Sequence, residues 1–325
     1  MVELAECFLP VEDELRALED QIQRELQTSS PALKSLVSHI SGYAGKRLRP
    51  ALVFLSAKAC GKDVTADHLR LAAIVELIHT ATLVHDDILD GAEVRRQVKT
   101  VNAIYGNQVP VLLGDFIYAR AFAMSVELPT PDASRVLARV TQIVCRGEIE
   151  QIFDRYDFEL DEAVYFKIIE AKTAELYAAA CELGALYAGA EAVQIEALAR
   201  FGRKIGVAFQ VIDDCLDLIG DEAVVGKSLG TDLEGGKLTL PLIRLGATCD
   251  LLERERLKAL VIEDGVLDRR ARLMEEFEIG PALDYAFQRA DDFIREAMVE
   301  LEALEPTSAR NALRNLAEFV LCRKK

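Results

Sequence analysis

The chain has no tryptophan, four histidines and nine prolines among its 325 residues. It also has no excess of positive charge, because its formal net charge is −16 and its isoelectric point is near 4.8. That balance argues against nucleic-acid binding, which requires a basic face. The Walker A, G-x-G-x-x-G and G-x-S-x-G motifs are missing, and no Cys/His spacing is typical of zinc, so nucleotide binding and serine nucleophile chemistry are not indicated.

The seven cysteines are scattered, and none forms a C-x-x-C pair. An odd number of dispersed thiols is typical of a reduced compartment, so we expect a cytoplasmic protein. The first residues have no basic stretch before an apolar one, and no signal peptide is expected. No apolar run approaches the roughly 18 uncharged residues of a membrane span, so no transmembrane segment is expected.

Apolar residues recur with a helical period over most of the chain, most clearly in 65–90, 131–156, 161–188 and 190–219. Helix starts are indicated at Ser30-Pro31, at Thr65 and at Pro131-Asp132. No sustained β alternation, linker or internal repeat is visible. Several of the expected helices are apolar on more than one face, as in the interior of a bundle. The sequence therefore predicts one all-α domain over residues 1–325, a single large helical bundle.

Two copies of one acidic motif, Asp-Asp-x-x-Asp, lie within otherwise apolar sequence. They comprise Asp86, Asp87, Asp90, Asp213, Asp214 and Asp217. Placing carboxylates among apolar residues is unfavourable unless a cation or hydrogen bonds offset the lost hydration. Residues four apart share a helix face, so each motif offers two carboxylates one turn apart, which suits a Mg²⁺ ion that also binds phosphate oxygens. The motifs therefore predict metal binding rather than a solvated acidic surface.

Basic residues follow both acidic motifs. Arg95 and Arg96 follow the first, Lys227 and Lys237 follow the second, and Lys46 and Arg49 lie in a third basic segment. His79 precedes Asp86 by seven residues and shares its helix face. Arg and Lys neutralise phosphate directly. Together these residues predict two diphosphate sites, one bound through metal and one bound by cationic side chains. Apolar walls next to them would shelter a carbocation left by ionisation of a diphosphate.

These motifs resemble those of the trans-isoprenyl diphosphate synthases, the polyprenyl synthetase family, from about residue 40 to the C-terminus. The matching stretches are 44–50, 76–90, 114–116, 147–148 and 209–217. The amino-acid sequence around the first acidic motif is most similar to that of long-chain members such as the octaprenyl diphosphate synthases. The resemblance implies an all-α fold of the isoprenoid synthase type with a central cavity, and a homodimer.

The resemblance also implies roles for single residues. Isopentenyl diphosphate would be held by Lys46, Arg49, His79 and Arg96. The allylic diphosphate would be held by Arg95, Lys172, Thr173, Gln210, Lys227 and Lys237. Mg²⁺, as three ions with substrate bound, would be ligated by Asp86, Asp90, Asp213 and Asp217, with Asp87 and Asp214 in or near that shell. The acidic residues and Lys172 would form the catalytic set.

The implied reaction is a head-to-tail condensation. The allylic diphosphate ionises, the isopentenyl double bond attacks, and a proton passes to the released diphosphate. Ala81 and Thr82, one turn before Asp86, are small and leave the path for the growing chain open, with Phe116, Tyr118, Phe122 and Met124 as candidate floor residues. We therefore expect an all-trans product of C30 to C50 for quinone side chains, with C40 as the single best expectation, released through peripheral contact with a membrane.

Two residues depart from the family pattern: Ala44 and Gln97 each stand at a position where the family usually has Gly. Since Gln does not readily adopt positive φ, Gln97 is expected to change the conformation of its loop. Three other functions remain open. They are a geranylgeranyl (C20) diphosphate synthase, a non-catalytic subunit of a heteromeric synthase, and a class I terpene cyclase. The complete set of acids and cations argues against the last two, and the small residues Ala81 and Thr82 argue against the first.

Overall fold

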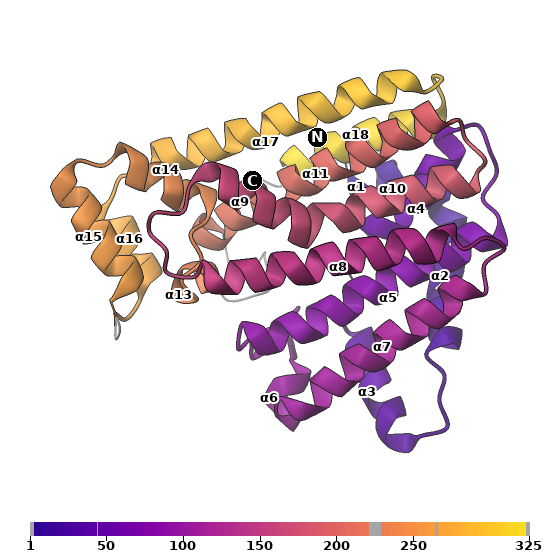
Figure 1. Cartoon of the computed structure of the whole chain (residues 1–325), viewed down its shortest axis with the longest axis horizontal. Helices are drawn as coiled ribbons and strands as arrows, with labels where there is room; N and C mark the ends of the chain where they lie inside the picture. The colour runs from indigo at the N-terminus through magenta and orange to yellow at the C-terminus, as the bar shows by residue number, and fades with distance from the viewer. Residues whose placement is uncertain (1–2, 44, 221–228, 264–265, 323–325) are drawn as a thin grey trace.

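The computed structural model describes residues 3–43, 45–220, 229–263 and 266–322 (Figure 1). Ala44 and Lys227, both named above, lie outside the described residues. The N-terminal half contains α1 (Leu4–Phe8), a 3₁₀ turn (Leu9–Val11), α2 (Glu12–Glu25), α3 (Pro31–Ser41), α4 (Leu48–Ala59), α5 (Ala66–Leu89), β1 (Val94–Arg95), β2 (Val98–Lys99), α6 (Val101–Tyr105), α7 (Gln108–Val126) and α8 (Asp132–Phe153).

The C-terminal half is again helical, and one π-helical segment interrupts it. Its elements are α9 (Glu162–Ile169), the π-helix (Glu170–Ala174), α10 (Glu175–Tyr187), α11 (Ala192–Ile219), α13 (Thr231–Glu234), α14 (Leu240–Thr248), α15 (Leu251–Ile262), α16 (Arg269–Glu276), α17 (Gly280–Glu300), a 3₁₀ turn (Leu301–Ala303) and α18 (Ser308–Cys322). The all-α fold class predicted from the periodicity is confirmed.

Two long helices, α5 and α11, lie at the centre of the packing. Helix α5 packs against α4, α7 and α10, while α11 packs against α10, α17 and α18. Their buried apolar side chains belong to one core that reaches from α1 to α18. Each acidic motif lies at the C-terminal end of its central helix, within the last two turns or just after them. The bundle therefore brings the two motifs to the same end of the molecule, where α13–α16 extend beyond the long helices (Figure 1).

The predicted helix starts agree with the structure. The Ser30 hydroxyl accepts a hydrogen bond from the Leu33 amide, and Thr65 forms a reciprocal cap with His68. Helix α8 begins after Pro131. These caps satisfy amide groups that have no partner within the helix. In the described part of the chain, the only β structure is the short antiparallel hairpin of β1 and β2.

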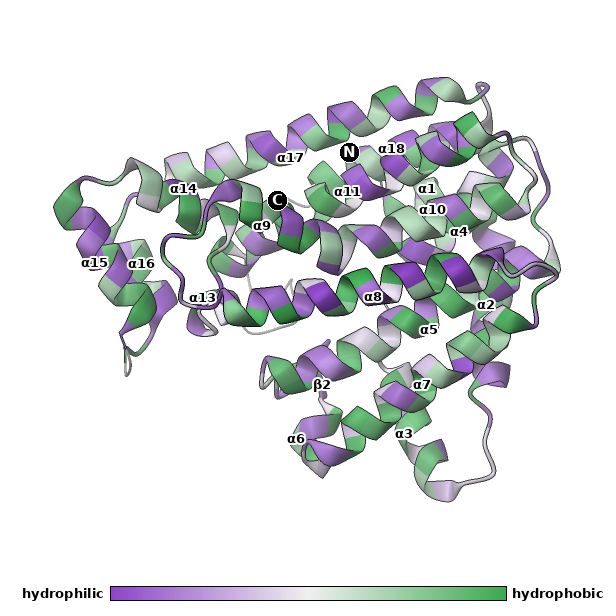
Figure 2. Cartoon of the chain, viewed as in Figure 1, coloured by the Kyte–Doolittle hydropathy of each residue, from purple (hydrophilic) through white to green (hydrophobic). Residues whose placement is uncertain are grey.

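Helix α7 is unusually apolar for its surroundings. By length and composition alone it could cross a membrane, and 39% of the relevant window is buried. The helix includes Asp115 and Arg120, so it is not the uncharged run of a typical membrane span. It packs against α5 and also contacts α6 and α8. Figure 2 shows apolar turns along α6 and α7 on the viewer's side. Part of the apolar surface of α7, at Val111, Leu112 and Val126, is therefore not covered by the described part of the chain.

The hairpin turn at Arg96-Gln97 corrects the expectation for its loop. Arg95 pairs with Val98, which leaves a two-residue turn, and both turn residues have positive φ, 50° at Arg96 and 65° at Gln97. Two consecutive positive φ angles are typical of a type I′ turn, which matches the twist of a hairpin. Gln97 thus adopts the conformation that Gly would supply, and the turn retains it despite the steric cost.

Replacing Gln97 with Gly should stabilise the protein, because the steric cost of positive φ is removed and exceeds the entropy that Gly loses on folding. We expect a gain of about 0.5–1 kcal/mol in the free energy of unfolding. Urea unfolding of the Gln97→Gly variant measures it. The control is Gln97→Ala, which keeps a Cβ at positive φ and should give no gain; equal gains in both variants would contradict this account of the turn.

Candidate active site

The first acidic motif contains one buried and two more exposed carboxylates. Asp86 and Asp90 point the same way from α5, as the four-residue spacing predicts, while Asp87 is buried. The Arg95 guanidinium donates a hydrogen bond of 2.7 Å to Asp87. Burial raises the pKa of Asp86, and Lys172 opposes that shift. Asp87 therefore anchors Arg95, and Asp86 is a desolvated carboxylate that a cation would stabilise.

Asp90 is surrounded by positive charge. Lys237 lies 2.9 Å and Arg155 3.0 Å from the same carboxylate oxygen of Asp90. Although burial opposes the change, Lys237, Lys172 and Arg155 together lower the pKa of Asp90. Lys237 also pairs with Asp232 at 3.2 Å. Asp90 is thus ionised well below neutral pH.

The π-helical segment supplies the next cation. π-helical turns are rare and occur frequently at functional sites. Here the segment carries Lys172, whose ammonium donates to Glu148 at 2.9 Å and to Gln151 at 3.0 Å. Both partners lie on α8, three residues apart and so on one face. Burial raises the pKa of Glu148, and Lys172 opposes that shift. The charge of Asp86 raises it further, which means that Glu148 and Lys172 lie beside the first motif.

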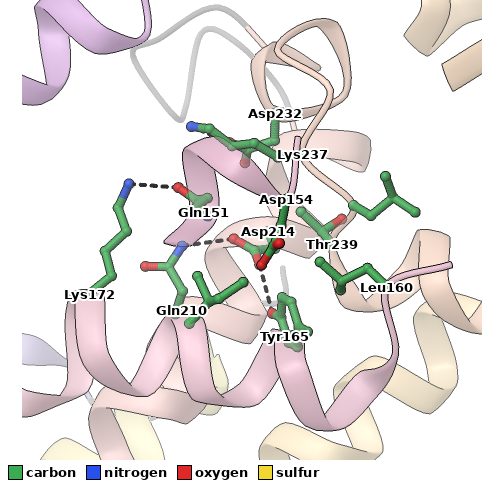
Figure 3. Close-up of a pocket in the computed structure, with 12 residues that line it drawn as sticks. Gln151, Asp154, Leu160, Tyr165, Lys172, Gln210, Asp214, Asp232, Lys237 and Thr239 are labelled. Atoms are coloured by element: carbon green, nitrogen blue, oxygen red, sulfur yellow. Dashed lines mark hydrogen bonds and ion pairs between the residues drawn. The ribbon is translucent and has the colours of Figure 1, made fainter. Parts of the chain in front are cut away.

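A chain of hydrogen bonds holds the second acidic motif. The Tyr165 hydroxyl and the Gln210 amide each donate to Asp214 at 2.7 Å, and the Thr173 hydroxyl donates to Gln210 at 2.8 Å. Burial raises the pKa of Asp214 to about 7, and the nearby charge of Asp232 adds to the shift. Figure 3 shows Tyr165, from α9, and Gln210, one turn before Asp214 on α11, both directed at Asp214. Asp214 is therefore held in place by fixed donors, as Asp87 is in the first motif, and it also lines the pocket drawn in Figure 3.

The other two acids of the second motif differ from each other. Asp213 is half-buried. Asp217 is completely buried, and its carboxylate accepts hydrogen bonds from the Thr231 hydroxyl and the Asp232 amide at the start of α13. These contacts give Asp217 a structural role, although the four-residue spacing places it on the face of Asp213. Its assignment as a metal ligand stays a prediction.

A pocket lies between the second motif and the loop after α8 (Figure 3). Lys172 lies on one side of Asp214, and Leu160 and Thr239 lie on the other. The lining combines acids, amides and two ammonium groups with apolar side chains, and it comprises Gln151, Asp154, Leu160, Tyr165, Ile168, Lys172, Gln210, Asp214, Asp232, Lys237, Leu238 and Thr239. Such a mixed lining is typical of a small-molecule site.

The second predicted site is a cluster of arginines around His79. Burial lowers the pKa of His79 far below its usual range, and Arg49, Arg96, Arg95 and Arg47 lower it further. Burial also lowers the pKa of Arg96, and the positive charge of Arg95 lowers it further. His79 is thus a neutral donor or acceptor among cations that repel one another. An anion would relieve that repulsion.

The members of this cluster are held individually. Arg49 stacks on the Tyr177 ring at 4.3 Å, and its buried Nε finds no hydrogen-bond partner among the described residues. Lys46 lies 5.3 Å from the centre of the Phe319 ring. Arg96 donates to the Tyr43 carbonyl, and its guanidinium occupies the space where a side chain on residue 45 would lie. Gly45 thus gives room to the Arg96 guanidinium, a contact that the sequence did not reveal.

Arg47, between Lys46 and Arg49, is not available to a ligand. Its guanidinium forms ion pairs with Glu19 at 2.6 Å and Glu76 at 2.5 Å, and Glu76 is buried. Arg47 has a φ of 52° just before α4. The buried pair fixes the start of that helix, and with it Arg49 one half-turn later.

The donors present fit a divalent hard cation. Asp86 and Asp90 offer carboxylate oxygens one turn apart, Asp86 is desolvated, and the second motif, with Asp213, ends its helix at the same end of the bundle (Figure 1). Within the described ranges, no three acidic, His or Cys side chains converge closely enough to hold an ion alone. Mg²⁺ retains waters and substrate phosphate oxygens in its shell, so two carboxylates and a diphosphate would complete it.

The two predicted chain-length residues lie on different faces of α5. Ala81 is completely buried in the core, while Thr82 is partly buried and its hydroxyl donates to the His79 carbonyl at 2.8 Å. Of the candidate floor residues on α7, Met124 is completely buried, and Phe116, Tyr118 and Phe122 pack partly buried against the core.

Sequence reasoning assigned no role to five residues of the site: Glu148, Gln151, Arg155, Tyr165 and Asp232. Of these, Glu148 lies in the stretch 147–148 that matches the family. Three carried a usable signal. Glu148 and Gln151 share a face of α8, and Tyr165 lies seven residues, or two turns, before Lys172. Arg155 and Asp232 come from a loop and from the start of a four-residue helix, where no periodicity identifies them.

Comparison with known proteins agrees with this geometry. The family model described as "Polyprenyl synthetase" matches residues 30–276. The heptaprenyl diphosphate synthase component 2 of Geobacillus stearothermophilus is 36% identical over 311 residues, which cover 95% of both chains. The octaprenyl diphosphate synthase of Escherichia coli K12 is 34% identical, with 93% of both chains covered. A polyprenyl synthase from Caulobacter crescentus CB15, solved with calcium and isoprenyl diphosphate, has a TM-score of 0.95 at 36% identity and covers 99% of this chain and 98% of its own.

The all-helical fold and the paired acidic motifs define a class of diphosphate-utilising prenyltransferases. Within that class, this chain belongs to the polyprenyl synthetase family, as the resemblance in the sequence indicated, and it has trans-prenyl diphosphate synthase activity.

Replacing Tyr165 with Phe should weaken the second motif without leaving a void. Loss of one of the two donors to buried Asp214 should cost about 1–3 kcal/mol in the free energy of unfolding. We expect turnover to fall by roughly tenfold, since Asp213 is displaced with its neighbour. Urea unfolding and steady-state kinetics measure these effects. Tyr187→Phe is the control, because the Tyr187 hydroxyl bonds Thr130 at an exposed edge; equal losses in both variants would contradict a specific role for Tyr165.

Proposed function

We propose that this chain condenses isopentenyl diphosphate with an allylic diphosphate, using Mg²⁺, to form a long-chain all-trans polyprenyl diphosphate for quinone side chains. The observation that carries the proposal is the separation of two anion sites with opposite chemistry. One combines the carboxylates Asp86 and Asp90 with Lys172 and Lys237. The other is the arginine cluster around His79.

The residues of each site suggest how the reaction is divided between them. Bound Mg²⁺ would neutralise the allylic diphosphate and assist its departure as a leaving group. Asp86, Asp90 and Asp213 would hold the ions, while Lys172 and Lys237 donate to diphosphate oxygens. Arg49, Arg96 and neutral His79 would hold isopentenyl diphosphate without metal. Its double bond could then attack the allylic carbon that loses diphosphate, and the released diphosphate takes the proton.

Product length is the finer part of the proposal. The names of similar proteins range from short-chain isoprenyl to octaprenyl and nonaprenyl diphosphate synthases. Ala81 faces the core of the bundle and is the smallest side chain that could lie there apart from glycine. Each added isoprene unit buries more apolar surface, at about 0.8 kcal/mol per CH₂ group, so an open path favours elongation. These considerations support a C30–C50 product, with C40 preferred.

A product assay tests the function. Purified chain, Mg²⁺, farnesyl diphosphate and labelled isopentenyl diphosphate should give a ladder that ends between C30 and C50 when separated by chromatography. Chelation of the metal with EDTA should abolish condensation, because the carboxylates would then repel the diphosphate. A ladder that stops at C20 would favour a geranylgeranyl diphosphate synthase. No condensation by the isolated chain would favour a subunit of a heteromeric enzyme.

The same assay applied to Ala81→Phe tests the account of chain length. A phenyl ring one turn below Asp86 should block the path and shorten the main product by several isoprene units. Thermal melting establishes that the variant is folded, and Thr82→Phe provides a second variant on the neighbouring face of α5. Unchanged products from folded Ala81→Phe would overturn the role of Ala81.

We also propose that two copies of the chain form a homodimer in the cytoplasm through the face of α6, α7 and α8. Large apolar side chains are exposed there: Ile104, Tyr105, Val111, Leu112, Val126, Ile149, Ile152 and Phe153. Leu112 is 68% and Phe153 83% exposed, whereas monomers rarely expose such an extended apolar area. A two-fold axis would let the same face cover itself. Seven free cysteines are consistent with a reducing compartment.

Light scattering after size exclusion tests the dimer. The native chain should have twice the mass of one copy, and Leu112→Glu should convert it to the monomer, because a carboxylate would then be buried in an apolar interface. Leu251→Glu is the matched control, since Leu251 is 85% exposed on α15, away from this face. A monomeric native chain, or dissociation by both variants alike, would contradict the proposed interface.

A further inference from the structure

Arg155 occupies an unexpected position beside the first acidic motif. It lies in the loop after α8, outside every motif of the sequence, yet its guanidinium is 3.0 Å from Asp90. Lys237 contacts the same Asp90 oxygen at 2.9 Å. Lys237 has a second partner in Asp232, whereas the buried Nε of Arg155 finds none among the described residues. Two cations therefore share one carboxylate oxygen, and one of them retains an unused buried donor.

A contact between two loops produces this arrangement. The Tyr156 amide donates to the Gly236 carbonyl at 2.7 Å, which joins the loop after α8 to the turn before α14. The Tyr156 ring occupies the space that a Cβ on residue 236 would need, and Gly236 has a φ of 71°. Only glycine fits there, for both reasons. The neighbours of these two residues, Arg155 and Lys237, are thereby directed to Asp90 together.

The surrounding charges indicate what the pair is for. A partly exposed ion pair contributes little to stability, so a second cation on Asp90 gains little as a structural contact. A diphosphate, by contrast, has several oxygens and more negative charge than one lysine can neutralise. Arginine has five donors in a rigid fork that suits phosphate oxygens. When Asp90 takes part in metal binding, a guanidinium that shared its oxygen is left beside the bound anion.

We propose that Arg155 is a further diphosphate-binding residue, which pairs with Lys237 on the metal-dependent side of the site. Without a diphosphate it rests on Asp90, and with one bound it donates to a diphosphate oxygen. The ligand class is an allylic diphosphate or the inorganic pyrophosphate released from it. The inference rests on the proposed function for the first of these ligands, but binding of pyrophosphate can be measured without turnover.

Isothermal titration of the full chain with inorganic pyrophosphate in the presence of Mg²⁺ tests the proposal. Arg155→Gln should weaken binding by about tenfold, the effect of one charge-assisted hydrogen bond, and Arg155→Lys should recover part of the loss. Arg146→Gln is the matched control: Arg146 lies on α8, is 65% exposed and pairs only loosely with Glu150 at 3.7 Å. It should bind pyrophosphate as the native chain does. In the kinetic assay, Arg155→Gln should raise KM for the allylic diphosphate and leave KM for isopentenyl diphosphate unchanged.

The alternative role of Arg155, neutralising Asp90 without binding diphosphate, gives a different result in the same titration. If Arg155 only neutralises Asp90, Arg155→Gln should bind pyrophosphate with native affinity and need less Mg²⁺ for half-maximal effect, because a competitor for the carboxylate is gone. That result would overturn the proposal, provided that thermal melting shows the variant folded. Native chain that binds pyrophosphate through Arg155 but forms no prenyl product would reject the condensation and leave this anion site in place.

Discussion

The cost of removing carboxylates from water determines how this site is built. In each acidic motif the second aspartate turns inward: Asp87 is bonded to Arg95, and Asp214 to Tyr165 and Gln210. The first aspartate of each motif is only half-buried. Adjacent helical residues differ by about 100° in direction, so one buried and one more exposed carboxylate follow directly from the doublet. The anchored member of each pair therefore fixes the direction of its neighbour.

Charge is sorted between the two halves of the site. Ammonium groups and acids alternate near Asp90, so a metal and a diphosphate can replace contacts that already exist. Around His79 four arginines converge, and the acids that approach them are already paired, Glu76 with Arg47 and Asp87 with Arg95. The first half holds more acids than cations before its ligands arrive, with Asp86, Asp90, Asp232 and Glu148 against Lys172, Lys237 and Arg155. The second half contains Arg49 and Arg96, which form no ion pair with a carboxylate among the described residues. This difference would let each substrate find its own place without specific recognition of its hydrocarbon part.

The sequence contained most of the fold and about half of the site. Periodicity located the long helices, and the four-residue spacing placed Asp86 and Asp90 on one face. The same spacing was insufficient for Asp217, because α13 packs over it and uses its carboxylate. Arg155 and Asp232 could not be found at all, since their positions depend on how loops distant in sequence meet. Gln97 shows the opposite case: hairpin geometry overrode the residue's own preference.

The π-helical segment at Glu170–Ala174 joins α9 to α10, which would otherwise form one continuous α-helix. A wider turn takes up one extra residue, so the face of α9 that carries Tyr165 has a different angular setting from the face of α10 that packs on α11. Deleting a single residue there would restore an unbroken α-helix and swing Tyr165 by about 100° about the axis. The direction of the Tyr165 hydroxyl toward Asp214 on another helix therefore depends on the number of residues in this segment as well as on the identity of the side chains.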